Sequence, residues 1–195
     1  MRKIMRNEKL HRLVWISVFS AIAFVLVAFG RIWIPPFEPF LKYDLGDIPA
    51  IIAAYILGPI AGLTVQTLKS LLFLISGTSQ EGPVGILANF LAGGSLVVAT
   101  SLVHRLVDPQ RNKHAAWGLI SAVAGTLVMT AILIPLNALV VYPLWGMTGA
   151  AAWSGALVIS TPFNLFKGFL SCAISLAFYR RLEPFMLGRS SGRAA

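Results

Sequence analysis

The chain has 195 residues, of which 57% are hydrophobic and only 12% are charged, and its mean hydropathy is +0.79. A soluble domain carries roughly 25% charged residues, so the composition excludes an ordinary soluble protein and a disordered chain. The formal net charge of +9 has two interpretations: basic cytoplasmic segments of a membrane protein, or a surface that binds nucleic acid. We favour the first. We therefore interpret the chain as an integral protein of the lipid bilayer.

The first predicted element is an apolar helix that follows a basic N-terminus. Residues 13–30 carry no charge over 18 positions, which is enough for one crossing where the bilayer is locally thin beside neighbouring helices. Ser17 and Ala21 form a small-xxx-small pair, where the backbone of another helix can approach closely. We expect this pair to dock a partner protein or, alternatively, to pack within the chain's own bundle. A cleaved signal peptide is the alternative for residues 1–30.

The following elements are predicted from the distribution of basic residues. Three clusters hold most of them: Arg2, Lys3, Arg6, Lys9 and Arg12; Arg105, Arg111 and Lys113; and Arg180, Arg181, Arg189 and Arg193. The positive-inside rule places all three clusters in the cytoplasm, so an even number of crossings separates consecutive clusters. Residues 48–80 must then cross twice, with a break at Gly58-Pro59, because proline clashes in a helix interior. Residues 115–179 also cross twice, with a break near Pro143 and Gly146.

The expected fold is an all-α membrane protein with six transmembrane helices and with both termini in the cytoplasm. We place the helices at roughly 13–33, 47–58, 59–77, 83–106, 115–142 and 153–181, in a single transmembrane domain over residues 1–195. Thr161-Pro162 has the pattern of an N-cap followed by proline at the first helical position. The sixth helix is therefore expected to start or kink at this pair.

Three polar residues stand out inside the apolar helices that precede the sixth. Lys69 lies deep in the third helix, and we expect it either to line a cavity or to pair with an acid such as Glu81. Asn89 and Asn137 are amides in apolar surroundings. For both, an interhelical hydrogen bond is the alternative to ligand contact.

Lys167 lies inside the sixth helix, far from the basic clusters. A lysine near the bilayer centre costs roughly 2.5–3.5 kcal/mol, so such a residue indicates function. Ser160, Asn164, Lys167 and Ser171 recur at helical spacing and form one polar face. We interpret Asn164 and Lys167 as ligand-facing, with snorkelling of Lys167 toward an interface as the alternative. The ammonium is treated as unpaired, so Lys167→Met is expected to preserve or raise thermal stability.

The sequence contains none of the enzyme motifs that we looked for. The chain has no GxxxxGK[ST] phosphate loop, so it is not expected to hydrolyse ATP by itself. The HExxH, GxSxG and DxDxDG motifs are also absent, and no histidines or cysteines have metal-ligand spacing. We predict a protein without enzymatic activity, bound metal or cofactor.

A series of motifs resembles one family of vitamin transporters. They are residues 40–49 (FLKYDLGDIP), 58–62 (GPIAG), Lys69, 82–85 (GPVG), 88–95 (ANFLAGGS) and 161–168 (TPFNLFKG). In this order they resemble the riboflavin-specific S components of energy-coupling factor (ECF) vitamin transporters. The resemblance implies high-affinity capture of riboflavin from outside a prokaryotic cell. It also implies a multi-pass protein of the plasma membrane that is energised by a transmembrane T component and two cytoplasmic ATPases.

The same resemblance implies roles for individual residues. The vitamin is expected to contact Leu41, Asn137, Asn164 and Lys167, with Tyr43, Asp44, Asn89, Gly94 and Thr161 as further positions. S components usually present an Ala-xxx-Ala motif on the first helix to the T component. Ser17-xxx-Ala21 is the nearest match here, and it departs from that motif at Ser17.

The chemistry of riboflavin agrees with these residue types. An asparagine amide carries both a donor and an acceptor, so Asn137 and Asn164 suit the uracil-like edge of the flavin. Phe40, Trp145 and Phe163 are candidates for the walls around its rings. Another vitamin or another flavin such as FMN is an alternative ligand. An intramembrane enzyme that uses Lys167 with Asp44 or Asp47, and a scaffold protein without a ligand, are the alternative functions.

Overall fold

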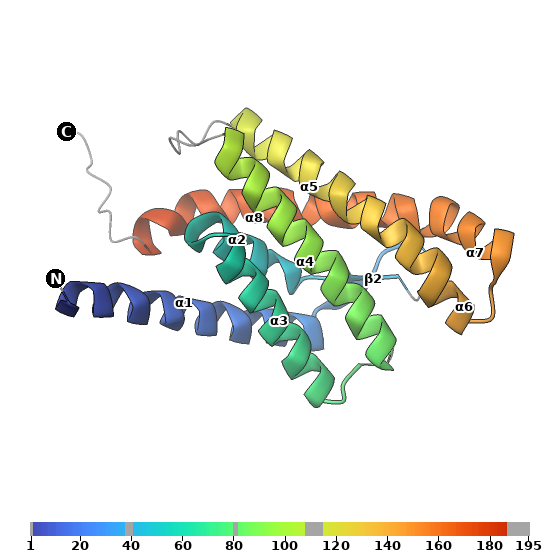
Figure 1. Cartoon of the computed structure of the whole chain (residues 1–195), viewed down its shortest axis with the longest axis horizontal. Helices are drawn as coiled ribbons and strands as arrows, with labels where there is room; N and C mark the ends of the chain where they lie inside the picture. Colours follow the sequence, from blue (N-terminus) through green and yellow to red (C-terminus); the bar gives the residue numbers. More distant parts are fainter. Residues whose placement is uncertain (1, 38–40, 80–81, 108–114, 187–195) are drawn as a thin grey trace.

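The computed structural model describes residues 2–37, 41–79, 82–107 and 115–186, which form an elongated bundle of helices with one small β-hairpin (Figure 1). The elements are α1 (Arg2–Phe29), β1 (Arg31–Trp33), β2 (Lys42–Asp44), α2 (Asp47–Leu57), α3 (Pro59–Ile75), α4 (Gly82–Val107), α5 (Ala115–Leu136), η1 (Asn137–Val141), α6 (Tyr142–Leu144), α7 (Gly149–Gly155), η2 (Ala156–Ser160) and α8 (Thr161–Met186). The elements η1 and η2 are π-helical turns. Because α5, η1 and α6 are contiguous, as are α7, η2 and α8, the described residues form six helical rods.

Four of these rods are long and apolar enough to cross a membrane. They are Glu8–Phe29, Gly82–Val107, Ala116–Leu144 and Gly149–Met186. The other two are shorter, since α2 has 11 residues and α3 has 17. At 1.5 Å per residue, α2 is about 16 Å long, roughly half the thickness of the hydrocarbon layer. Asp47 to Ile56 are all buried, so α2 is the central helix and the other rods surround it.

The break between α2 and α3 lies at Gly58. Its φ of 109° is in the range that favours glycine, because a Cβ atom strains the backbone there. Pro59 follows at the first position of α3, where its missing amide hydrogen leaves no intrahelical bond unmade. The interruption expected at Gly58-Pro59 is thus the point where the two short helices separate.

Of the two outcomes expected at Thr161-Pro162, a helix start or a kink, the structure contradicts the start. The helix begins at Gly149 and runs through this pair to Met186, so the pair does not start it. The π-helical turn η2 precedes Pro162 instead. This widened turn accommodates a residue that cannot donate an amide hydrogen and whose ring crowds the preceding turn. The hydroxyl of Thr161 donates to the carbonyl oxygen of Ala156 across the turn, at 2.9 Å.

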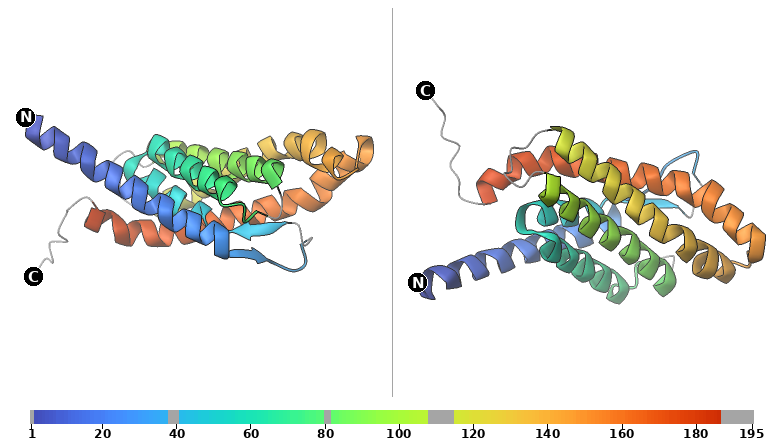
Figure 2. Two further views of the ribbon diagram at one scale, coloured as in Figure 1. Left: turned by 90° about the horizontal axis from the view of Figure 1, so that it is seen from below. Right: turned by 45° about the horizontal axis from the view of Figure 1, so that its top comes forward.

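The two ends of the bundle carry different elements. In Figure 1, the start of α1, the end of α8, the α2–α3 turn and the facing ends of α4 and α5 gather at one end. The α6–α7 turn and the end of α3 lie toward the other. The hairpin continues from the end of α1 (Figure 2), and its antiparallel register pairs Arg31 with Asp44 and Trp33 with Lys42. This register brings β2 back to the start of the buried helix α2.

Candidate functional site

A pocket lies among β2, α4, the α5–η1–α6 rod and the α7–η2–α8 rod, and its volume is about 100 Å³. Its lining residues are Arg31, Leu41, Lys42, Gly85, Ala88, Asn89, Ala92, Leu133, Asn137, Val141, Tyr142, Trp145, Ser160, Phe163, Asn164 and Lys167. Apolar and aromatic side chains therefore share one cavity with amides, a hydroxyl and cations. This combination is typical of a small-molecule site, where apolar walls bind and a few polar groups orient the ligand.

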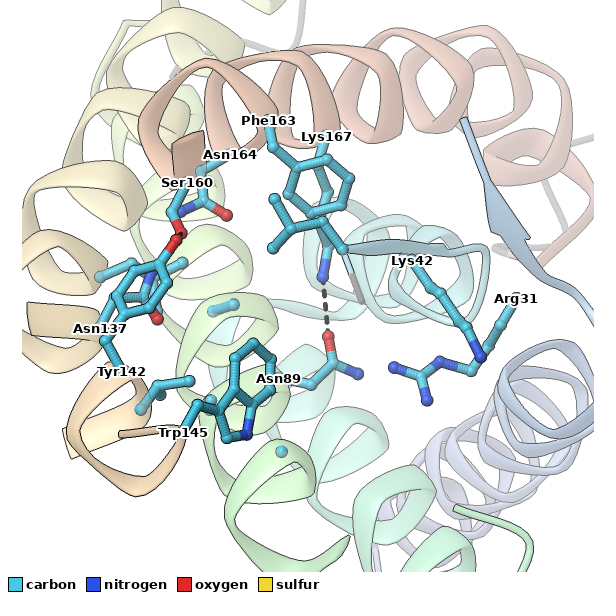
Figure 3. A pocket seen from close by; sticks show the side chains of 16 residues that line it. Arg31, Lys42, Asn89, Asn137, Tyr142, Trp145, Ser160, Phe163, Asn164 and Lys167 are labelled. Carbon is cyan, nitrogen blue, oxygen red and sulfur yellow. Dashed lines mark hydrogen bonds between the residues drawn. The ribbon is translucent and has the colours of Figure 1, made fainter. Parts of the chain in front are cut away.

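The two π-helical turns supply part of the pocket wall. Asn137 and Val141 belong to η1, and Ser160 ends η2. The phenol of Tyr142 joins the two rods, since its oxygen lies 2.9 Å from the Ser160 hydroxyl and accepts a hydrogen bond there. It also donates to the carbonyl oxygen of Gly155 at 3.2 Å. Figure 3 shows Asn137, Tyr142 and Ser160 gathered on one side of the pocket, with Lys42 and Arg31 on the other.

Two pocket-lining residues, Asn89 and Lys167, belong to a closed ring of five side chains, which we call the ion-pair ring. Lys167 donates to the Asn89 amide oxygen at 2.7 Å, and the Asn89 nitrogen donates to Asp44 at 2.6 Å. Lys69 bridges Asp44 at 2.8 Å and Asp47 at 2.7 Å. The ring closes with the ion pair between Lys167 Nζ and Asp47 Oδ2 at 3.1 Å. The members come from α8, α4, β2, α3 and α2 respectively.

The four charges of the ring are buried and balanced. Asp44 and Asp47 are 0% exposed, Lys69 is 1% exposed and Lys167 is 3% exposed. Two carboxylates face two ammonium groups, so the ring carries no formal net charge. Burial alone favours the neutral acid, but the ammonium groups of Lys69 and Lys167 hold the pKa of Asp44 below its usual range. A buried ion pair tolerates the loss of water only when its members remain matched and hydrogen-bonded.

The structure brings five of the nine predicted vitamin-binding positions together in the pocket. They are Leu41, Asn89, Asn137, Asn164 and Lys167, and the predicted wall residues Trp145 and Phe163 line it as well. The remaining predicted wall residue, Phe40, lies outside the described residues.

The other four predicted positions do not line the pocket as described. Tyr43 is buried and its hydroxyl lies 3.0 Å from that of Ser171. Asp44 lies behind Asn89 as a member of the ion-pair ring. Gly94 is buried on α4, and Thr161 bonds within its own rod.

For the buried lysines, the structure corrects the expectation for Lys167 and confirms, for Lys69, the alternative of pairing with an acid. Lys167 is not an unpaired ammonium, because Asp47 lies 3.1 Å from it. Lys69 pairs with Asp44 and Asp47, and the suggested partner Glu81 lies outside the described residues. The acids that meet these lysines precede α3 in the sequence, in β2 and at the first residue of α2.

Sequence reasoning missed three further contributors to the site. Arg31 and Lys42 line the pocket from the hairpin. Gln66 is fully buried behind it and donates to Asp47 at 3.2 Å. A signal for Gln66 was present, because Gln66 and Lys69 are spaced i, i+3 and lie on one face of a largely apolar helix.

The predicted docking pair lies on the surface of α1. Ser17 and Ala21 are both exposed, and the Ser17 hydroxyl donates to the carbonyl oxygen of Leu13 in its own helix. Their neighbours Val14 and Val18 are exposed too. The opposite face of α1 packs into the bundle instead.

A second hollow lies between α5 and α8. Its volume is about 260 Å³, and its lining consists of Leu119, Ala122, Phe169, Ala173, Leu176, Ala177 and Arg180. Arg180 is the single polar side chain in this lining, so the hollow offers few groups that would orient a ligand. The first pocket, where polar groups converge, is therefore the candidate site.

Comparison with known proteins decides the family. The model of the family described as "ECF transporter, substrate-specific component" matches residues 11–179. The chain belongs to this family. Like its relatives, it is a membrane transport component and not an enzyme.

Individual relatives match this chain over nearly its whole length. It is 35% identical over 191 residues to the riboflavin transporter RibU of Staphylococcus aureus (strain TCH60), covering 95% of this chain and 97% of that protein. It is 33% identical over 187 residues to the riboflavin transporter FmnP of Bacillus subtilis (strain 168), covering 91% and 95%. A solved structure of the S component of a bacterial ECF transporter superposes with a TM-score of 0.74 at 34% identity, covering 93% of this chain and 98% of that one.

Proposed function

We propose that this S component captures riboflavin in the pocket between β2, α4, η1 and α8 and delivers it across the membrane. The observation that carries the proposal is the convergence of three amides and one ammonium, from Asn89, Asn137, Asn164 and Lys167, in a single pocket with aromatic walls. Relatives with 33% and 35% identity that are named riboflavin transporters support the same ligand.

The chemistry of riboflavin matches this arrangement group by group. Its tricyclic ring is flat and largely apolar, and Trp145 and Phe163 offer aromatic surfaces for it. Its uracil-like edge alternates donors and acceptors, which an asparagine amide complements with one group of each kind. The ammonium of Lys167 supplies a further donor for a ring carbonyl. We assign the recognition of that edge to Asn137 and Asn164, which both line the pocket.

A second candidate ligand is FMN, the 5′-phosphate of riboflavin. Arg31 and Lys42 line the side of the pocket opposite Tyr142 (Figure 3), and cations suit a phosphate group. Competition between riboflavin and FMN for the purified S component distinguishes a riboflavin-specific site from one that accepts both.

The lining must move when a flavin binds. A volume of about 100 Å³ is well below the roughly 300–1,000 Å³ of typical ligand pockets. Because the walls come from a hairpin and from two rods with π-helical turns, side chains on several elements can separate to admit the ring. Ligand binding is therefore expected to rearrange the region around β2.

We further propose six crossings of the plasma membrane, with both termini in the cytoplasm. The basic clusters support this topology, as does the meeting of the two ends of the described chain at one end of the bundle (Figure 1). The short helix α2 is surrounded by the other rods, so lipid does not meet its ends directly. The pocket then lies toward the external side.

Transport requires partners in this proposal, because the chain has no phosphate loop. A transmembrane T component and two cytoplasmic ATPases would supply the energy. The exposed face of α1 around Ser17 and Ala21 is the expected contact with the T component, because small residues admit a close helix.

The decisive experiment is a titration of the purified protein in detergent with riboflavin, followed by quenching of flavin fluorescence. Saturable quenching at a ratio of one flavin to one chain is expected. A protein prepared from cells should also be yellow and show the two-band absorption of a flavin. A colourless protein that leaves flavin fluorescence unchanged would refute the proposal.

A further inference from the structure

The ion-pair ring lies directly behind the candidate site. Two of its members, Asn89 and Lys167, line the pocket. The other three, Asp44, Asp47 and Lys69, are at most 1% exposed and lie behind the first two. Any effect of these three residues on a ligand must therefore pass through Asn89 and Lys167.

Hydrogen bonding within the ring determines how Asn89 is oriented. An ionised carboxylate accepts hydrogen bonds only, and an ammonium group donates only. The Asn89 nitrogen must therefore face Asp44, and its oxygen must face Lys167, as the distances of 2.6 and 2.7 Å show. One amide hydrogen and one lone pair of Asn89 then remain for a ligand.

The same accounting applies to Lys167. An ammonium group has three N–H donors. One donor goes to Asn89, and Asp47 Oδ2 lies 3.1 Å from the ammonium as its ion-pair partner, without a hydrogen bond. The ammonium lies at the pocket, where a further N–H can meet a ligand (Figure 3). The ring thus controls the direction in which this donor points.

Groups outside the ring hold the two carboxylates in place. The backbone amide of Gly46 donates to Asp44 at 2.7 Å, and Gln66 donates to Asp47 at 3.2 Å. Gly93 on α4 leaves space for the hydrogen bond between Gln66 and Asp47. A Cβ at this position would collide with the Gln66 amide and lie 2.6 Å from Asp47 Oδ1. The carboxylates are thereby fixed from their own elements and from α3 and α4.

We propose that Asp44, Asp47 and Lys69 are positioning residues, which orient Asn89 and Lys167 toward the ligand through a charge-balanced ring. This inference rests on the proposed function, since it names the groups that prepare the flavin site. Lys69 bridges Asp44 and Asp47 Oδ1, and the other oxygen of Asp47 faces Lys167. The loss of one charge, of Lys69 or of Asp44, draws Lys167 or Asn89 away from the pocket. The loss of both charges preserves the balance of the ring.

The test compares three variants: Lys69→Met, Asp44→Asn and the double variant. Methionine keeps most of the length of lysine, and asparagine keeps the shape of aspartate, so the ring changes by −1, +1 and 0 charges. Riboflavin dissociation constants are measured by fluorescence quenching, and melting temperatures are measured on the same samples. Each single variant is expected to bind riboflavin at least tenfold more weakly than wild type. The double variant is expected to bind within about threefold of wild type.

Ser175→Ala is the matched control. Ser175 is buried on α8 two turns beyond Lys167; its hydroxyl lies 2.6 Å from the Ser171 carbonyl oxygen and 3.3 Å from that of Ile48, and it contacts no side chain of the ring. This variant is expected to lower the melting temperature and to leave the affinity within threefold of wild type. A purely structural role for Lys69 and Asp44 predicts the same behaviour for their variants.

Each outcome bears on the proposal. A double variant that binds as weakly as the poorer single variant would overturn it, as would single variants with wild-type affinity. If a single variant does not fold, the double variant alone decides, because a loss of more than tenfold contradicts a balanced ring. Wild-type protein that fails to bind riboflavin refutes the proposed function instead, and the positioning role falls with it.

Discussion

Replacement of Lys167 by methionine tests whether its charge is paired, as the structure shows. The sequence alone led us to expect unchanged or higher stability, because an isolated ammonium in apolar surroundings is costly. The ion pair with Asp47 at 3.1 Å and the hydrogen bond to Asn89 at 2.7 Å reverse the expected sign. Lys167→Met leaves a buried carboxylate partly uncompensated and removes the donor to the Asn89 oxygen.

The expected magnitude follows from the burial of the pair. Removing one partner of a buried ion pair typically costs about 3–5 kcal/mol. For a chain of this size, 1 kcal/mol corresponds to about 2–4 °C in melting temperature. Lys167→Met is therefore expected to lower the melting temperature of the ligand-free protein by about 6–20 °C. The second change Asp47→Asn restores the charge balance and is expected to recover most of this loss.

Thermal unfolding in detergent, followed by intrinsic fluorescence of the five tryptophans, measures this effect without a ligand. The single variant Asp47→Asn, which leaves an excess positive charge, serves as the opposite control and should also be destabilised. A melting temperature of Lys167→Met equal to or above that of wild type would show that the ammonium is not paired. A double variant less stable than both single variants would show that charge balance is not the cause.

Three further predictions address the site, its support and the topology. Asn164→Ala should weaken riboflavin binding about five- to 150-fold, because an unsatisfied ligand edge costs about 1–3 kcal/mol; fluorescence quenching measures it, and an unchanged affinity would remove Asn164 from the site. Gly93→Ala should lower the melting temperature, since its Cβ would collide with Gln66; a variant as stable as wild type would mean that α3 and α4 can separate at no cost. Cysteines at Lys9 and at Thr148, which are both exposed and lie in α1 and in the α6–α7 turn, should react with impermeant reagents from opposite sides of the membrane; labelling from the same side would contradict the six-helix topology.

Local chemistry explains why much of the site could be predicted. Asn137, Asn164 and Lys167 are polar residues in apolar helices, and the bilayer penalises such residues unless they have a role. The break at Gly58-Pro59 was predictable because proline and glycine act on their own backbone. The π-helical turns were not predictable in this way. From the sequence alone, a helix can start, kink or widen at Thr161-Pro162. In the structure it widens, because the preceding residues from Gly149 pack as part of the same rod.

Composition, apolar runs and basic clusters determined from the sequence alone that this is a helical membrane protein, and single polar residues indicated the position of its site. Only the tertiary structure decided which charges meet. Lys69 is 22 residues from Asp47, and Lys167 is 78 residues from Asn89, so no local pattern specifies these pairs. They form because four other elements, β2, α3, α4 and α8, meet the buried helix α2. In that buried interior, each charge is stable only where an opposite charge already lies within reach.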